Sequence, residues 1–211
     1  MNWNLIQKNP VNQPLVGTYV DWKQQIAIEC FNQCVYCAIH ENSMGGIRNF
    51  HVEHYRPKSK FKDKENDYLN LFYSCAVCNT FKNNDWPNEP TPDNSRASYP
   101  NPSEIDYNFL FEIDHSKGLI EGKNIAAKYI QEKLFLNRPQ LITERRINLL
   151  YQRGDQEVEE TRKLLEKVKD DRDYRELSSV FMQLWSEFNA LKSQLQNIPR
   201  YDITDVTRPV Q

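Results

Sequence analysis

Hydrophobic and polar residues follow different periods along the chain, and these periods predict three regions. They are an N-terminal arm at residues 1–21, a middle domain at residues 22–108, and a hairpin with a helical C-terminal region at residues 109–211. The arm shows no helical period and contains Pro10, Pro14 and Gly17, which favour turns. Residues 85–102, inside the middle domain, are rich in Pro and Asn and are expected to be irregular.

The C-terminal region is predicted to begin with a β-hairpin and to continue mostly as helix. Short apolar stretches at residues 109–114 and 119–121 flank a turn that ends at Gly118. Farther on, apolar residues recur at alternating spacings of four and three, at Leu177, Phe181, Leu184, Phe188, Leu191 and Leu195. This spacing predicts one packed helix face, which Pro199 should end. The face is expected to pack on helices formed by residues 134–150, or alternatively to bind a partner as a coiled coil.

Composition changes this picture little. With 211 residues, 39% of them hydrophobic and 27% charged, the chain is expected to form one domain, or one domain with a helical extension. It contains no apolar run of membrane-spanning length, and its first residues, MNWNLIQKNP, lack the layout of a secretory signal. We therefore expect a protein that stays in the cytoplasm and does not enter membranes. The cytoplasm is reducing, so its cysteines are not expected to pair as disulfides.

Charge points to local and not general attraction to nucleic acid. The net charge is −2, which argues against a strongly basic nucleic-acid binder. One short segment is nevertheless basic, because five cations within nine residues are opposed by a single carboxylate, Asp63. These cations are Arg56, Lys58, Lys60, Lys62 and Lys64.

The cysteines indicate a metal site. Four of the five form two C-x-x-C pairs, Cys34 with Cys37 and Cys75 with Cys78, a pattern that predicts a closed, structural zinc site. The intervening residues 38–74 are too many for a minimal zinc ribbon, so a further folded segment is expected there. Cys30 is expected to be a buried small side chain, with a spare-ligand role as the alternative, and His40 is a possible substitute for a thiolate.

Between the cysteine pairs, residues 51–58 (HVEHYRPK) are predicted to be an extended segment ended by Pro57. Glu53 and His54 are adjacent within it. A carboxylate can bind a hard divalent cation, and a neighbouring imidazole can take a proton from water, so the pair suits metal-assisted hydrolysis. The alternative is an ordinary surface histidine beside a surface glutamate.

Taken together, these motifs resemble HNH nucleases that carry a zinc site. The corresponding elements are Cys34-x-x-Cys37, Glu53-His54 with Pro57-Lys58, Asn70-Leu71, and Cys75-x-x-Cys78-Asn79-x-x-Lys82. The stretches HVEHYRPKSKF and YLNLFYSCAVCNTFKNN, with the later FLFEID, GLIEG and LFLNRPQLITERR, are similar to the PtuB-type HNH nucleases of Septu and related retron anti-phage systems. The resemblance covers roughly residues 30–150.

This resemblance implies a fold and roles for individual residues. The fold is α+β, with a ββα-metal core, a structural zinc and a mainly α-helical C-terminal region. His54 would be the general base and Asn70 would orient the His54 region, while Glu53 and Asn79 would hold Mg²⁺ or Mn²⁺. His51 would be able to complete the ligand shell, and Asn70 would alternatively cap a turn. Phosphate contacts are expected from Arg56, Lys58, Lys60 and Lys82.

Two departures from the family pattern leave the metal preference open, because Glu53 replaces the commoner Asp and Asn79 replaces the final His. The expected function is a metal-dependent endonuclease that cuts DNA as the effector of an anti-phage defence system. The resemblance also implies a PtuA-like ATPase partner, bound through the C-terminal helical region. The alternative is a non-catalytic zinc-ribbon module that binds nucleic acid or a partner, but such a module needs neither Glu53 nor His54.

Overall fold

The computed structural model describes residues 3–168 and 171–196 of the chain. They form two compact units, which divide between Arg145 and Arg146. The division differs from the boundary expected after residue 108. Apolar side chains from the segment beyond that residue, such as Ile120 and Leu134, belong to the same buried core as the middle domain.

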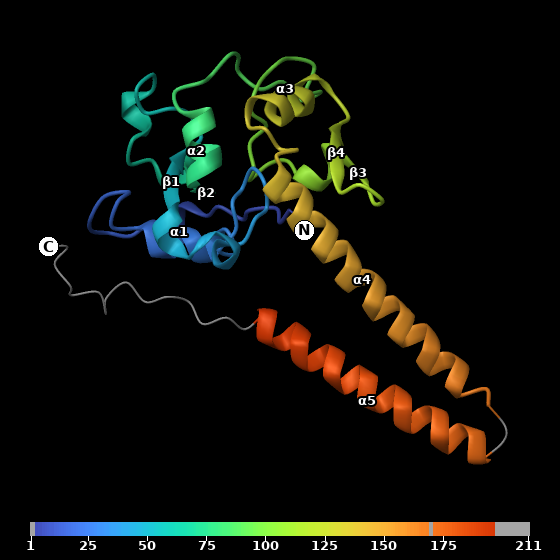
Figure 1. The fold of residues 1–211 in the computed structure, drawn as a ribbon. Coiled ribbons are helices and arrows are strands. Elements are labelled where there is room, and N and C mark those ends of the chain that lie inside the picture. Colours follow the sequence, from blue (N-terminus) through green and yellow to red (C-terminus); the bar gives the residue numbers. More distant parts are fainter. Residues whose placement is uncertain (1–2, 169–170, 197–211) are drawn as a thin grey trace, which may run out of the picture. The chain divides into compact units, whose positions relative to one another are not determined.

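The first unit combines two pairs of strands with short helices, and two long helices make up most of the rest (Figure 1). The α-helices are α1 (Lys23–Glu29), α2 (Ala76–Lys82), α3 (Ile125–Lys133), α4 (Pro139–Leu165) and α5 (Asp171–Gln196). The strands are β1 (Phe50–His54), β2 (Leu71–Cys75), β3 (Phe111–Asp114) and β4 (Leu119–Gly122). Short 3₁₀ turns connect them, among them η1 (Pro10–Asn12), η2 (Glu41–Met44) and η5 (Tyr68–Asn70). The mixed α and β architecture with a helical C-terminal region confirms the predicted fold class.

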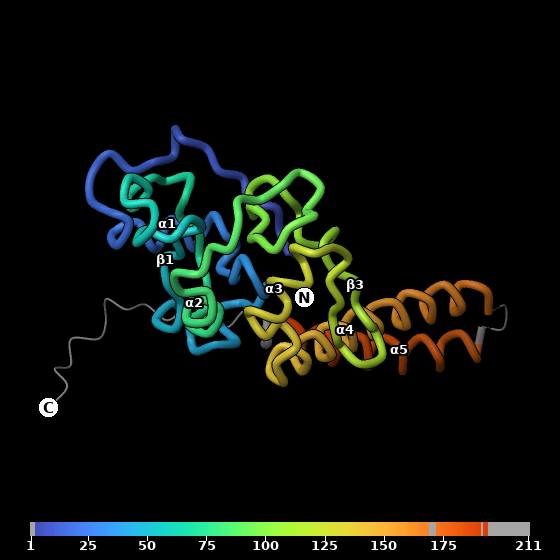
Figure 2. The backbone as a smooth tube through the Cα atoms, turned by 90° about the horizontal axis from the view of Figure 1, so that it is seen from above, coloured from blue at the N-terminus to red at the C-terminus, as the bar shows by residue number. Residues whose placement is uncertain are grey.

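At the centre of the first unit, β1 pairs antiparallel with β2, and β2 leads directly into α2. The sequence of β2, Leu-Phe-Tyr-Ser-Cys, is rich in aromatic and apolar residues and is buried throughout. The Sγ of Cys75 accepts a hydrogen bond from the backbone N–H of Cys78 at 3.4 Å, which caps the start of α2. Helix α2 contacts both strands and lies beside β1 (Figure 2). Together, β1, β2 and α2 therefore form a ββα motif.

The N-terminal arm lies across this motif and is anchored by two buried side chains, Trp3 and Ile6. The indole N–H of Trp3 donates to the carbonyl of Tyr36 at 3.1 Å, and its ring stacks on Phe111 at 5.2 Å. Within residues 3–21 of the arm, the regular structure is the 3₁₀ turn η1, in agreement with the absence of a helical period. The arm thus belongs to the first unit's core.

The hairpin predicted after residue 108 is confirmed as β3 and β4, which pair antiparallel. Its turn needs Gly118, which adopts a left-handed backbone with φ of +72°. At the end of β4, a Cβ on Gly122 would lie 2.5 Å from the backbone nitrogen of Lys128, so glycine permits α3 to pack closely. Residues 85–102 form turns and bends without helix or strand, as expected.

The second unit is a hairpin of α4 and α5. The ring of Phe188 packs against Gly154, where an added Cβ would lie 2.9 Å from the Cζ of Phe188. The ring centroids of Phe188 and Tyr151 are 6.5 Å apart. Lys192 forms an ion pair with Asp155. Phe188, on the predicted apolar face of α5, therefore packs on a part of α4 that lies beyond residue 150, whereas Leu177 and Leu184 of the same face are 52% and 60% exposed. The side chains of Leu191 and Leu195, and all of Pro199, are outside the described residues.

None of the helices within residues 3–168 and 171–196 has the length and apolarity needed to cross a membrane.

Candidate functional site

Four cysteines from two separate segments form one buried cluster. Cys34 and Cys37 lie in a tight turn after α1, and Cys75 and Cys78 lie at the junction of β2 and α2. Their four sulfurs all lie within 4.8 Å of one another. Tetrahedral zinc with Zn–S bonds of about 2.3 Å separates its sulfurs by about 3.8 Å, and the Sγ atoms of Cys37 and Cys75 are 3.8 Å apart. The number, type and spacing of these ligands therefore fit zinc.

The turn that carries the first pair is fixed by the backbone. Ala38 adopts a left-handed φ of +55° and donates its N–H to the carbonyl of Cys34 at 2.8 Å. Val35 donates its N–H to the carbonyl of Tyr73 in β2 at 3.0 Å, which joins the turn to the sheet. The cluster thus clamps the segment before β1 to the end of the ββα motif.

Arg138 covers the cluster from the start of α4. Its guanidinium nitrogens lie 3.6–3.7 Å from the sulfurs of Cys37, Cys75 and Cys78. A four-thiolate zinc site carries a net charge of −2, so an adjacent cation offsets part of that charge. This contact could not be predicted from the sequence, because Arg138 is 60 residues from the nearest cysteine and matches no spacing rule.

The other two candidate ligands near this cluster have different environments. Cys30 is buried apart from the four sulfurs, and burial raises the pKa of its thiol to about 12, so it is a neutral thiol. The Nδ1 of His40 accepts from the backbone N–H of Asn42 at 3.2 Å and caps η2. Neither residue belongs to the four-sulfur group.

A second feature, a pocket of about 410 Å³, opens beside β1 and α2. It is lined by the predicted site residues His51, Glu53, His54, Lys58 and Asn79, and by Tyr19 and Lys23 among others. Glu53 and His54 are neighbours on a strand and were expected to leave opposite faces unless the chain turned. In the structure both residues belong to the lining of one pocket, with Glu53 buried and His54 at the end of β1.

The ring of His54 is held in one orientation. Its Nε2 lies 2.9 Å from the backbone carbonyl of Glu65, which can only accept a hydrogen bond, so Nε2 carries the proton and Nδ1 has the free lone pair. Tyr19 packs its ring edge against the imidazole at 4.7 Å. Burial lowers the pKa of His54, and the nearby cations Lys58 and Lys82 lower it further. The imidazole is therefore neutral near pH 7 and able to accept a proton.

The carboxylate of Glu53 is buried and ion-paired. Its Oε1 lies 2.5 Å from Nζ of Lys82 and accepts from the hydroxyl of Tyr36 at 3.2 Å. Burial raises the pKa of Glu53, and the contacts with Lys82 and Tyr36 oppose that rise. Lys82 also donates to the backbone carbonyl of His54 at 2.9 Å.

Lys82 therefore differs from the sequence expectation. It was expected to contact phosphate, but its side chain is 0% exposed and its ammonium is used inside the core. The reason is its place at the end of α2, from which the side chain extends toward the end of β1. A solvent-side phosphate contact is not available to it.

Asn70 holds the loop between β1 and β2. Its side chain accepts from the N–H of Arg56 at 2.8 Å and donates to the carbonyls of Arg56 and Lys64 at 3.0 Å each. The cap of the 3₁₀ turn at this point is supplied by Asp67. Asn70 thus supports the loop that brings the Glu65 carbonyl to His54, and it does not act as the turn cap.

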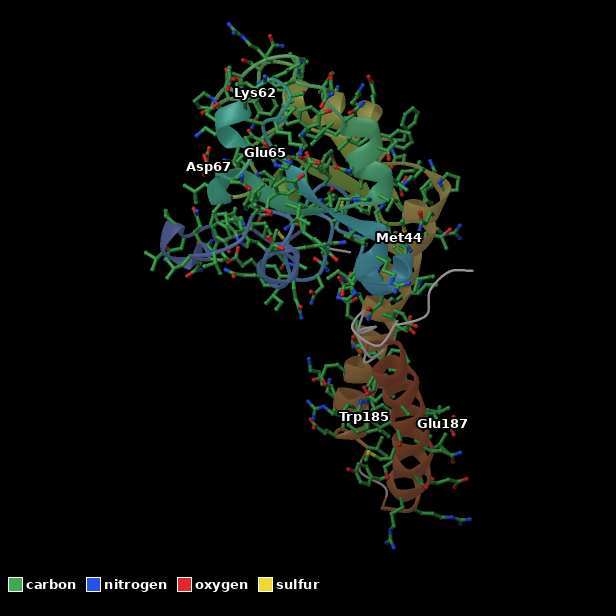
Figure 3. The ribbon with its side chains drawn as sticks, turned by 90° about the vertical axis from the view of Figure 1, so that its left-hand side faces the viewer. Met44, Lys62, Glu65, Asp67, Trp185 and Glu187 are labelled. Carbon is green, nitrogen blue, oxygen red and sulfur yellow. The ribbon has the colours of Figure 1, made fainter. Side chains whose placement is uncertain are left out.

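The cations of the basic segment are largely paired with carboxylates. Lys58 lines the pocket and contacts Glu65 at 2.8 Å and the hydroxyl of Tyr19 at 2.7 Å. Arg56 instead pairs with Glu89 and lines a separate pocket, and Lys60 donates to the carbonyl of Trp86 at 3.4 Å. In Figure 3, Lys62 lies on the same loop as the acidic residues Glu65 and Asp67. Of the predicted phosphate contacts, Lys58 is the one that lines the pocket.

Two residues of the pocket lining and one backbone contact of His54 were not predicted from the sequence. Tyr19 comes from the N-terminal arm, Lys23 from α1, and the Glu65 carbonyl from the loop after β1. None belongs to a spaced motif, and a backbone carbonyl leaves no signature in residue type. Their contribution depends on how the chain folds around β1.

The donor set in the pocket suits a hard divalent cation. Glu53 offers a carboxylate oxygen, Asn79 an amide oxygen and His51 an imidazole nitrogen. Burial and the neighbouring Lys23 lower the pKa of His51, which favours the neutral form that can ligate. A proton acceptor, His54, lines the same pocket.

Comparison with known proteins matches part of the chain to one family. Among the curated proteins, none matches the chain. Residues 34–85 match the family model "HNH endonuclease". The matched segment contains both cysteine pairs, Glu53, His54 and Asn79. The chain therefore contains an HNH endonuclease domain, built from the ββα motif and the four-cysteine cluster.

Proposed function

We propose that this protein is a metal-dependent endonuclease that hydrolyses phosphodiester bonds of DNA. One observation carries the proposal: His54, Glu53 and Asn79, from β1 and α2, line a single pocket in a segment that matches HNH endonucleases. A binding module without chemistry would not require a neutral, oriented imidazole beside a buried carboxylate.

The residues of the pocket have separate roles in this proposal. His54 takes a proton at Nδ1 from the attacking water, while the Glu65 carbonyl keeps the ring oriented through Nε2. Asn70 acts as a positioning residue for the loop that carries Glu65. Lys58, Lys60 and Arg56 contact backbone phosphates, which orients nucleic acid without reading its sequence.

Glu53 and Asn79 would hold a Mg²⁺ or Mn²⁺ ion, with His51 as a further ligand. Such an ion, when bound, stabilises the negative charge that grows on the phosphate and on the leaving oxygen. Cys34, Cys37, Cys75 and Cys78 would hold a structural zinc ion, which suits the reducing cytoplasm because all four are free thiols.

We further propose that the protein acts in anti-phage defence together with an ATPase partner, as the similarity to PtuB-type nucleases suggests. Support for a protein partner comes from the second unit. There, α4 and α5 form an apolar groove of about 690 Å³. Apolar side chains near it, including Val180, Leu184 and Trp185, are more than 40% exposed. Exposed apolar surface of this kind is typical of protein interaction sites.

The test is a cleavage panel on supercoiled plasmid, single-stranded DNA and RNA. Wild type and His54→Ala are assayed with Mg²⁺, Mn²⁺ or EDTA, each with and without any ATPase encoded beside the gene. Metal-dependent nicking of DNA by wild type and its loss in His54→Ala are expected. Cleavage of RNA alone would mean that the substrate is RNA and not DNA. Absence of cleavage under all conditions would favour the non-catalytic binding module.

A further inference from the structure

Lys82 occupies an unusual position for a lysine at the end of a helix. Its side chain is 0% exposed, and its Nζ contacts two oxygens that come from adjacent residues of β1. One is Oε1 of Glu53 at 2.5 Å, and the other is the backbone carbonyl of His54 at 2.9 Å. One ammonium group thus bonds both to the candidate metal ligand and to the residue that carries the candidate base.

The surroundings of the ammonium restrict it to these oxygens. Tyr99 lies below it, with the ring centroid 5.3 Å from Nζ, and Tyr36 donates to the same Oε1 of Glu53 at 3.2 Å. Both tyrosines are buried, and their rings meet edge to face at 6.1 Å. Lys82 and Tyr36 both bind Oε1, so neither contact uses the other carboxylate oxygen, Oε2.

We propose that Lys82 is a positioning residue of the hydrolytic site, which fixes the Glu53 carboxylate for metal binding and the His54 backbone for proton transfer. This proposal rests on the proposed nuclease function and deepens it. The Lys82 side chain is 0% exposed, so it acts through Glu53 and His54. A bulk stabilising role would instead predict loss of thermal stability with unchanged metal binding in the folded protein.

The experiment compares Lys82→Met, Lys82→Arg and a matched control, Lys128→Met, which makes the same substitution at an exposed lysine of α3. Zinc content and thermal midpoint report folding, Mn²⁺ titration followed by calorimetry reports metal affinity, and plasmid nicking at saturating Mn²⁺ reports kcat. Wild type and His54→Ala are included to test the nuclease function separately.

Lys82→Met is expected to keep zinc, to bind Mn²⁺ roughly 10- to 100-fold more weakly, and to nick more slowly even at saturating Mn²⁺. Both losses are expected because the variant releases the carboxylate and the backbone together. The arginine variant should recover part of the affinity, and the control should match wild type. A folded Lys82→Met with wild-type Mn²⁺ affinity and kcat would overturn the proposal.

Removing one partner of a buried ion pair often unfolds a domain, so Lys82→Arg is the second discriminating variant. It keeps the positive charge, but its planar guanidinium cannot place one nitrogen against both oxygens in the same way. It should fold and bind Mn²⁺ several-fold more weakly, and unchanged affinity and rate would contradict the proposal. If the wild-type protein neither binds Mn²⁺ nor cleaves DNA, the proposed nuclease function is wrong. If the wild type is active and the Lys82 variants match it in Mn²⁺ affinity and rate, only the role proposed for Lys82 is wrong.

Discussion

Arg138 lies with its guanidinium 3.6 Å from the sulfur of Cys78, although 60 residues separate them in the sequence. Arg138 immediately precedes α4, and Cys78 lies in α2. The contact therefore ties the segment that leads into the long helix to the four-cysteine cluster. It also lies beyond residues 34–85, the part of the chain that matches the HNH endonuclease family.

Replacing Arg138 should weaken zinc binding without abolishing it. In Arg138→Met, the four thiolates lose a cation that offsets their charge, so zinc affinity should fall roughly 10- to 100-fold. Competition with a chromophoric chelator measures the affinity, and Arg146→Met, at a helical position beyond the cluster, is the matched control. Equal zinc affinity in both variants would mean that Arg138 has no part in the site.

Cys75→Ser should lose zinc and loosen the first unit. Cys75 contributes a sulfur and also caps α2, so the change removes a ligand at the junction of strand and helix. Metal analysis and amide hydrogen exchange of β2 and α2 provide the measurement. His54→Ala should instead stay folded and zinc-loaded but inactive, and equal zinc loss in the two variants would contradict this division between structural and catalytic roles.

The rate of cleavage should rise with pH through an apparent pKa that lies below that of an ordinary histidine, and then level off. The groups that face His54 are Lys58, Lys82 and Glu65, and burial with the two cations lowers the pKa of His54. Since the neutral imidazole is the active form, activity is present above this lowered pKa and is lost as the pH falls through it. A pH–rate profile at saturating Mn²⁺ tests this, and an apparent pKa above 7 would argue against His54 as the base.

Asn70→Ala should destabilise the first unit and disturb the base. The change removes three hydrogen bonds to the backbone of the loop, one from Arg56 N–H and two to the carbonyls of Arg56 and Lys64. At about 1 kcal/mol or more for each buried bond, unfolding should become easier by roughly 2–4 kcal/mol. Urea denaturation measures this loss, and Asn70→Asp, which keeps the acceptor and loses the donors, should lie between wild type and alanine.

Gly154→Val should disrupt the helical hairpin and leave the first unit intact. A Cβ at this position would lie 2.9 Å from the Phe188 ring, so the helices must move apart or the ring must rotate. Overpacking of this kind costs about 1–3 kcal/mol. Hydrogen exchange of α5 should increase while zinc content stays constant, and Ser179→Val, on an exposed position of α5, controls for β-branching in a helix. Equal exchange in both variants would show that Phe188 does not need Gly154.

Local patterns in the sequence were sufficient for a large part of the fold and of the site. The cysteine spacing identified the four members of the cluster, because C-x-x-C places two sulfurs within reach of one ion whatever surrounds them. The β3–β4 hairpin followed from its turn glycine, and the place of Phe188 on the side of α5 that meets α4 followed from the helical period. Glu53, His54 and Asn79 could be predicted because motif and neighbour chemistry are both local properties of the chain, and all three line one pocket.

Tertiary structure decided what no local pattern encodes. Lys82 appeared in the sequence as one more cation, and only the packing of α2 on β1 turned it inward to Glu53. Tyr19, the Glu65 carbonyl and Arg138 contribute through contacts between segments far apart in the chain. The extent of the first unit was decided in the same way, by burial of side chains beyond residue 108 in a shared core. Such contacts depend on distance in space, which residue type and spacing along the chain do not specify.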